Sequence, residues 1–287
     1  MMDSQNLPTQ KDNGFVDKLK RIVGRYIGGT SDNSSQIIQT VAADESMLPE
    51  MKSAAVSVIE KEARRLKNRK RIVEKAASIK SDDEIIPDEK PTDDWMARFF
   101  NTVEDITEDT MQNLWAQILA GEVKRPHSFS LRTLDVLRNM TKEDAELYVR
   151  VINSYCFDGY ILTEDQYGIS LEDRITLCEM GLLSPDELTQ TITQTQEVNI
   201  QRLNHNYALK LTKNTTGIIE VKFECRTLTK SGRELLQLVD DNGNYDMFAY
   251  VANKFKKAGM TSVTLHKVLN WGVEGTVRYY ILPEKIY

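Results

Sequence analysis

The longest uninterrupted stretch of the chain runs from Pro49 to Lys80 and contains no glycine and no second proline. Both residue types interrupt helices, because proline lacks an amide hydrogen and glycine loses much backbone entropy on folding. Apolar side chains recur through the stretch at Met51, Ala55, Val58, Ile59, Leu66, Ile72, Val73 and Ala76. The spacing predicts one long helix, so we expect a fold built largely on helix packing.

Charge reverses along the chain after this predicted helix. Residues 61–80 hold nine Lys or Arg against two Glu, whereas residues 81–110 hold eleven Asp or Glu against two Lys or Arg. Either the basic helix binds nucleic-acid phosphates, or the two segments neutralise each other within the fold or across a dimer. For the first alternative, the candidate nucleic-acid-binding cations are Arg64, Arg65, Lys67, Arg69, Lys70, Arg71, Lys210, Lys213 and Lys222.

Strong helix start signals follow in residues 92–153. Thr92 and Thr107 each precede acidic residues, as helix N-caps do, and Thr141 to Asp144 resembles a capping box. Met111, Leu114, Trp115, Ile118 and Leu119 follow the i, i+3, i+4, i+7, i+8 spacing of one helix face. The pattern predicts a compact central helical unit with its tryptophans in the core.

Residues 118–131, ILAGEVKRPHSFSL, gather charged side chains directly behind this helix. Glu122 and His127 could form an acid–base pair, with the two cations between them holding an anion. Alternatively, Gly121 ends one helix in a left-handed conformation and a stiff joint leads into the next. The second interpretation is favoured, because each residue type there has a local explanation. It leaves a possible contact loop made of Glu122, Lys124, Arg125 and His127.

Residues 154–240 change to a mixed pattern. The segments NYALKL and IIEVKFECR alternate polar and apolar residues around KNTTG, which predicts a β-hairpin. With the helix signals before and after it, this order resembles a winged-helix domain. Its candidate recognition helix, LEDRITLCEM, begins with acids that would repel phosphates. A packing or protein-binding module is therefore favoured over DNA readout.

The predicted fold class is mainly α with a smaller β component (α+β). Segment patterns predict a flexible tail at 1–13, an N-terminal helical region at 14–80, an acidic linker at 81–91, the central helical unit at 92–153, a winged-helix-like domain at 154–240 and a small C-terminal α/β cap at 241–287.

Composition argues against several classes of protein. The net charge of −6 does not suit a uniformly basic nucleic-acid binder. No apolar run reaches the roughly 18 residues that span a bilayer, and the first residues lack an apolar signal region. Three widely spaced cysteines form no C-x-x-C pair, which argues against zinc and against a disulfide framework. We expect a cytoplasmic protein with no metal and no cofactor.

Residues 14–28 predict a basic amphipathic helix that Gly28 and Gly29 end. Such a helix can lie on an anionic membrane surface. The alternative is that its apolar face docks on its own protein, and this is favoured. The apolar face consists of Phe15, Leu19, Ile22, Val23 and Tyr26.

Catalytic motifs are absent from the sequence. It has no G-x-x-x-x-G-K-[ST] phosphate loop and no H-E-x-x-H pair, and His127, His205 and His266 lie far apart. NIQRLNH, which ends at His205, is only faintly similar to helical ribonuclease toxins. We therefore predict no catalytic residues.

The segment DDWMARFFNTVEDITEDTMQNLWAQILAGEVKRPHSFSLRTLDVLRNMTKEDAELY resembles an uncharacterised bacterial family, domain of unknown function 2806. That family is similar to the abortive-infection Abi-alpha proteins, which share the LWA-x-x-LA helix. KLKRIVGRYIGG, LCEMGLL and LTKSGREL also fit its layout, whereas residues 30–60 depart from it. The resemblance implies a bacterial or prophage accessory protein linked to phage defence.

Together these features favour a non-enzymatic protein that binds a protein partner or itself. A nucleic-acid-binding winged-helix regulator is the alternative, and a toxin with nuclease or membrane activity is the second alternative. A membrane contact is expected only through residues 14–28.

Overall fold

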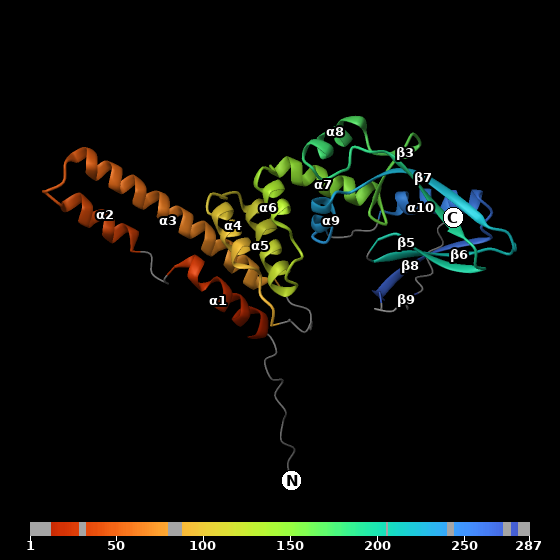
Figure 1. Ribbon diagram of the computed structural model, residues 1–287, viewed down its shortest axis with the longest axis horizontal. Coiled ribbons are helices and arrows are strands. Elements are labelled where there is room, and N and C mark those ends of the chain that lie inside the picture. Colours follow the sequence, from red (N-terminus) through yellow and green to blue (C-terminus); the bar gives the residue numbers. More distant parts are fainter. Residues whose placement is uncertain are drawn as a thin grey trace, which may run out of the picture. The chain divides into compact units, whose positions relative to one another are not determined.

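The structure, a computed structural model, describes residues 13–28, 33–79, 88–204, 206–239, 244–271 and 277–280 (Figure 1). The chain forms two compact units, residues 1–138 and 139–287. The predicted α+β class is confirmed, since the described part of the first unit is helical and that of the second combines helices with two antiparallel sheets. The unit boundary lies inside the stretch 92–153. The tail predicted at 1–13 and the linker predicted at 81–91 lie largely outside the described residues.

The predicted long helix is confirmed as α3, which starts with Pro49 in the first helical position, where a missing amide hydrogen costs nothing. The described helices of the first unit are α1 (Asn13–Ile27), α2 (Ser34–Ala43), α3 (Pro49–Ser78), α4 (Asp93–Val103), α5 (Asp109–Lys124) and α6 (Leu131–Arg138).

Local capping explains where several helices begin. The Thr92 side chain accepts a hydrogen bond from the Trp95 amide at the start of α4, as predicted. The predicted cap at Thr107 is wrong by one residue, because the carboxylate of Glu108 accepts the bond from the Met111 amide at 2.6 Å. An anionic cap also suits the positive end of the helix dipole.

Aromatic residues of α4 and α5 form the core of the first unit. Phe99 meets Trp115 edge-on with ring centroids 5.5 Å apart, and both side chains are fully buried. Helix α1 adds Phe15, Leu19 and Val23 to the buried set and packs on α3 and α5. The apolar face of residues 14–28 is therefore docked on its own protein, as favoured from the sequence.

The predicted end of α5 at Gly121 is wrong. Helix α5 continues to Lys124, and Gly121 is not in the left-handed region. A Cβ at position 121 would lie 2.8 Å from Cε2 of Phe129, so the glycine lets this buried ring approach the helix. Close packing, rather than a positive φ, is what requires glycine here.

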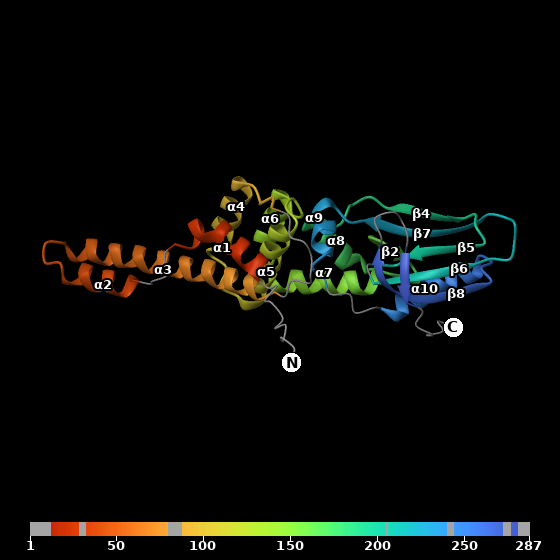
Figure 2. The same ribbon diagram turned by 90° about the horizontal axis from the view of Figure 1, so that it is seen from below.

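The second unit contains two antiparallel sheets (Figure 2). One has the order β1-β2-β7-β4 with β3 added beside β2, and the other has the order β5-β6-β8-β9. The strands are β1 (Cys156–Phe157), β2 (Tyr160–Glu164), β3 (Tyr167–Gly168), β4 (Leu188–Gln194), β5 (Val198–Arg202), β6 (Tyr207–Thr212), β7 (Ile219–Thr227), β8 (Ser262–Trp271) and β9 (Val277–Tyr280). The helices are α7 (Lys142–Tyr155), α8 (Leu171–Glu179), α9 (Lys230–Leu236) and α10 (Tyr245–Lys257).

The hairpin predicted around KNTTG is wrong. Strand β6 pairs with β5 and β8, whereas β7 pairs with β2 and β4, so the two expected partners belong to different sheets. Alternating burial fixes which face of each strand is inside but not which strand lies beside it. Helix α10 shares one apolar core with both sheets, through Phe248, Val251 and Phe255.

Candidate functional site

Part of the basic run in α3 is neutralised within the first unit. Arg65 Nη1 lies 3.2 Å from Oε1 of Glu104, and Arg69 pairs with the other oxygen of the same carboxylate, which is 12% exposed. A hydrogen bond from Arg65 lowers the pKa of Asp105 below its ordinary value. Lys75 pairs with an acid at the start of α5. These contacts support intramolecular neutralisation, the second of the two alternatives drawn from the charge reversal.

Three of the four remaining predicted cations of α3 face outward. Arg64, Lys67 and Arg71 are exposed, whereas Lys70 is half-buried. Their spacing of three and four places the first three on one helix face, with the exposed residues Glu60 and Glu74 one turn beyond. Of the predicted cations of α3, this face therefore offers three to phosphates, and an acidic residue lies at each end of the three.

The three lysines predicted farther along the chain do not lie on one hairpin. Lys213 is buried, and its ammonium donates to the carbonyl oxygens of Gln194 and Gly217. Lys210 belongs to β6 and Lys222 to β7, in different sheets. Lys213 therefore stabilises the loop in which it lies. Of the three lysines, Lys222 is the exposed one.

The loop after α5 is organised by a buried carboxylate. Oε1 of Glu122 accepts from the His127 amide at 2.7 Å, and Oε2 accepts from the Phe129 amide at 2.9 Å. Burial raises the pKa of Glu122 despite these bonds. The imidazole of His127 is exposed and lies 3.2 Å from Glu89 instead. Glu122 therefore contacts the backbone of residue 127 and not its ring.

The two cations of the same loop have separate surroundings. The ammonium of Lys124 lies 5.3 Å from the ring centre of Phe15, and Arg125 is exposed. His127 has a φ of 71°, a left-handed conformation that costs a residue with a side chain about 1–2 kcal/mol. This geometry fits the interpretation of residues 118–131 as a stiff joint between two helices.

The structure also contains an uncovered apolar surface on the first half of α3, which was not predicted from the sequence pattern. Leu48, Met51, Ala55 and Val58 make up this surface, which we call the apolar seam. Leu48, Met51 and Val58 are 64%, 56% and 61% exposed. Every buried residue of α3 lies in its second half, from Asn68 onward, and α2 has none. In both views α2 lies along the part of α3 that extends beyond α4 and α5 (Figures 1 and 2).

The seam was missed because periodicity reports a helix face and not whether that face is covered. Met51, Ala55 and Val58 have the same spacing as the buried residues Ile72 and Ala76. The available signal was the polar composition of residues 30–47, which supplies few apolar side chains to cover a neighbouring helix.

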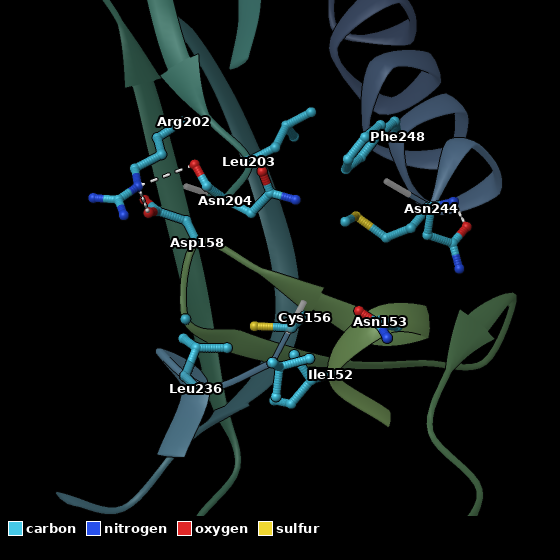
Figure 3. A pocket seen from close by; sticks show the side chains of 13 residues that line it. Ile152, Asn153, Cys156, Asp158, Arg202, Leu203, Asn204, Leu236, Asn244 and Phe248 are labelled. Carbon is cyan, nitrogen blue, oxygen red and sulfur yellow. Dashed lines mark hydrogen bonds and ion pairs between the residues drawn. The ribbon is translucent and has the colours of Figure 1, made fainter. Parts of the chain in front are cut away.

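A cavity of about 180 Å³ lies within the second unit (Figure 3). Its rim carries Asp158, whose pKa is raised by burial and whose Oδ1 lies 3.8 Å from Nε of Arg202. Asn204 and Asn244 use their side-chain oxygens to accept backbone amides of nearby residues. The lining also includes the thiol residue Cys156. These amide oxygens shape the loops around the cavity.

Within the part of the chain that the structure describes, His, Cys, Asp and Glu side chains nowhere gather in threes that could bind a metal ion. Among the same residues, none of the helices combines the length and apolarity needed to cross a membrane.

The fold and its surfaces define an α+β protein with a helical unit that carries an uncovered apolar seam. The chain belongs to the family described as "Protein of unknown function (DUF2806)", which matches residues 55–160 and 158–252. No curated protein and no solved structure matches it.

Proposed function

We propose that the chain is a non-enzymatic interaction protein of a bacterium or prophage, acting in anti-phage defence of the abortive-infection type. The apolar seam is the observation that supports an interaction role. Soluble proteins rarely leave adjacent large apolar side chains open to water unless a partner covers them. Leu48, Met51 and Val58 are each more than half exposed.

The seam has the geometry that helix recognition requires. Its members are spaced by three, four and three residues, so they share one face of α3. Helix α2 packs beside the seam, and Lys52 ties the two helices by donating to the Ala42 carbonyl at 2.9 Å. A helical hairpin braced in this way presents its apolar face without having to fold on binding.

The defence role is supported only by the expectation, drawn from the sequence, that the family to which this chain belongs is similar to the abortive-infection Abi-alpha proteins. The proposal places the chain in the cytoplasm, where Cys156, Cys178 and Cys225, which form no disulfide, stay reduced.

Phage challenge of bacteria expressing the chain tests both parts of the proposal. We expect protection against at least one phage, loss of protection in a Met51→Glu/Val58→Glu variant, and retention in a Ser53→Glu/Ser57→Glu control. The control changes two exposed residues on the outer side of the same helix. Protection that survives Met51→Glu/Val58→Glu would contradict docking through the seam. Absence of protection across a broad phage panel would contradict the defence role.

A nucleic-acid-binding winged-helix regulator is the alternative, and the exposed cations Arg64, Lys67 and Arg71 favour it. This function requires binding to DNA or RNA that weakens steeply with salt, because bound phosphates release counterions. Arg64→Ala/Arg71→Ala should then reduce the salt slope by about two. A lack of binding near 50 mM salt would rule it out.

The second alternative, a toxin with nuclease or membrane activity, has less support. His205 lies outside the described residues, and the apolar face of α1 is buried.

A further inference from the structure

The apolar seam is one end of a face that runs the whole length of α3. The 3,4 spacing continues from Val58 through Glu62, Arg65 and Arg69 to Ile72 and Ala76. In the second half this face is covered, since Ile72 and Ala76 are buried and α3 packs on α4 and α5. The seam is therefore the uncovered continuation of an established helix–helix interface.

We propose that a second copy of this chain covers the seam, with the two α3 helices antiparallel. This inference rests on the proposed docking role and names its partner. Antiparallel helices pack through side chains at 3,4 spacing, each fitting between residues of the opposite helix. A surface that pairs with itself must be complementary to itself under a two-fold rotation.

The seam meets this requirement in one register. Setting Met51 opposite Ala55 of the second copy also sets Leu48 opposite Val58, so all four seam residues meet apolar partners. Of the two neighbouring registers, one would place Met51 opposite Glu62 and Leu48 opposite Arg65, which buries charges beside apolar groups. The other would leave Ala55 and Val58 beyond the start of the opposite α3, so that only Leu48 and Met51 meet apolar partners on it. Apolar matching therefore selects a two-fold axis close to Ser53.

Charge complementarity supports the same register. Glu45 lies in the turn that precedes α3, and Lys61 lies eight residues after Ser53 on the helix itself. At a rise of about 1.5 Å per residue, the two-fold axis places the exposed Lys61 of one copy just beyond the start of the other copy's α3, beside the turn that carries the exposed Glu45. Asp44 and Arg64 extend the acidic and basic ends, so opposite charges meet at both ends of the seam.

Four apolar residues per copy form a small interface. Stable complexes bury about 1,200–2,000 Å² in total with some 20–30 residues a side, and a seam of four residues per copy falls below this range. We therefore expect a reversible dimer whose population rises with protein concentration.

Sedimentation of the full chain over a range of concentrations tests the inference. We expect the mass to rise from 32.9 kDa toward twice that value. Met51→Glu/Val58→Glu should stay monomeric with an unchanged helical signal, since both residues are exposed in one copy. Ser53→Glu/Ser57→Glu should associate like the parent chain. Glu45→Lys should weaken association, and Glu45→Lys/Lys61→Glu should restore it.

Cross-linking tests the register. Ala54 and Ser53 are both exposed in one copy, but only Ala54 flanks the seam, because Ser53 points to the opposite side of α3. In a Cys178→Ser background, a short bismaleimide should join Ala54→Cys chains into dimers far more efficiently than Ser53→Cys chains. Equal yields would overturn the proposed register.

The outcomes separate this inference from the proposed function. A chain that stays monomeric at all concentrations, and still loses phage protection on Met51→Glu/Val58→Glu, would overturn self-association while leaving docking to another protein in place. A dimer that persists in Met51→Glu/Val58→Glu would overturn the seam as the contact.

Discussion

The guanidinium of Arg65 donates two parallel hydrogen bonds to the carboxylate of Asp105, from Nε to Oδ1 and from Nη2 to Oδ2, each 3.2 Å long. Nη1 of the same group pairs with Glu104. These bonds attach the middle of α3 to the connection between α4 and α5. Part of the basic run at 61–80, which by itself suggests phosphate binding, therefore stabilises the helical unit through ion pairs.

Glu104→Gln should lower the free energy of unfolding by about 1–3 kcal/mol, the usual range for hydrogen bonds to charged groups. The change removes the charge that Arg65 and Arg69 share on a mostly buried carboxylate. Glu60→Gln, on the exposed face of the same region, should change stability by less than about 0.5 kcal/mol. Urea unfolding of both variants measures the difference. Equal losses would mean that the Glu104 pairs contribute nothing beyond a surface charge.

Local signals in the sequence predicted helix starts, because a helix cap depends on residues that are close together along the chain. The capping box formed by Thr141 and Asp144 is present with both of its hydrogen bonds, and Thr92 caps α4 as predicted. Pairing between distant strands could not be predicted in this way. Strand β4, with its polar sequence LTQTITQ, lies beside β7 although nothing local marks it as a partner.

The same distinction between local signals and contacts of distant segments applies to the candidate surfaces. Sequence spacing placed Met51 and Val58 on one helix face, but only the packing of α4 and α5 decides where that face stops being covered. Likewise, the lysine run could not reveal that Lys213 is buried on two carbonyl oxygens. The sequence pattern identifies which residues share a helix or strand face, and tertiary contacts decide whether that face is buried or exposed.

Gly121→Ala should destabilise the first unit by about 1–3 kcal/mol, the range for overpacking a core. The added methyl group would lie 2.8 Å from Cε2 of Phe129, which is buried and cannot move freely. Gly24→Ala is the matched control, because its Cβ meets nothing within 4 Å and alanine favours the helix by up to about 1 kcal/mol. Thermal unfolding should therefore shift in opposite directions for the two variants. A stabilising Gly121→Ala would show that the ring has room.

The bidentate pair between Arg150 and Asp173 predicts a pH dependence in the second unit. Hydrogen bonds at 2.9 and 3.0 Å hold the pKa of Asp173 below its ordinary value. On acidification the unfolded chain therefore takes up the proton first, so the pair stabilises above the ordinary pKa and is lost as pH falls through the folded one. Arg150→Gln should cost at most about 1 kcal/mol at pH 7, since Arg150 is largely exposed and screened by water.

Urea unfolding from pH 7 into the acid range tests this pair. The stability difference between the parent chain and Arg150→Gln should shrink toward zero in acid, and the NMR-titrated pKa of Asp173 should rise in the variant. Lys222→Gln, an exposed change in the same unit, should show neither effect. A difference that stays constant with pH would contradict the assigned hydrogen bonds.

Trp115 supplies the sharpest test of the first unit's core. Its side chain is fully buried against Phe99, and its indole nitrogen has no hydrogen-bond partner among the described residues. Trp115→Ala should cost roughly 3–5 kcal/mol through lost contacts and a cavity. Trp115→Phe keeps most of the apolar volume and removes the unsatisfied N–H group, so it should cost less than about 2 kcal/mol. Chemical unfolding of the two variants separates the contribution of packing from that of the N–H group. If Trp115→Phe lowered the free energy of unfolding as much as Trp115→Ala, the indole nitrogen would have to donate a stabilising hydrogen bond.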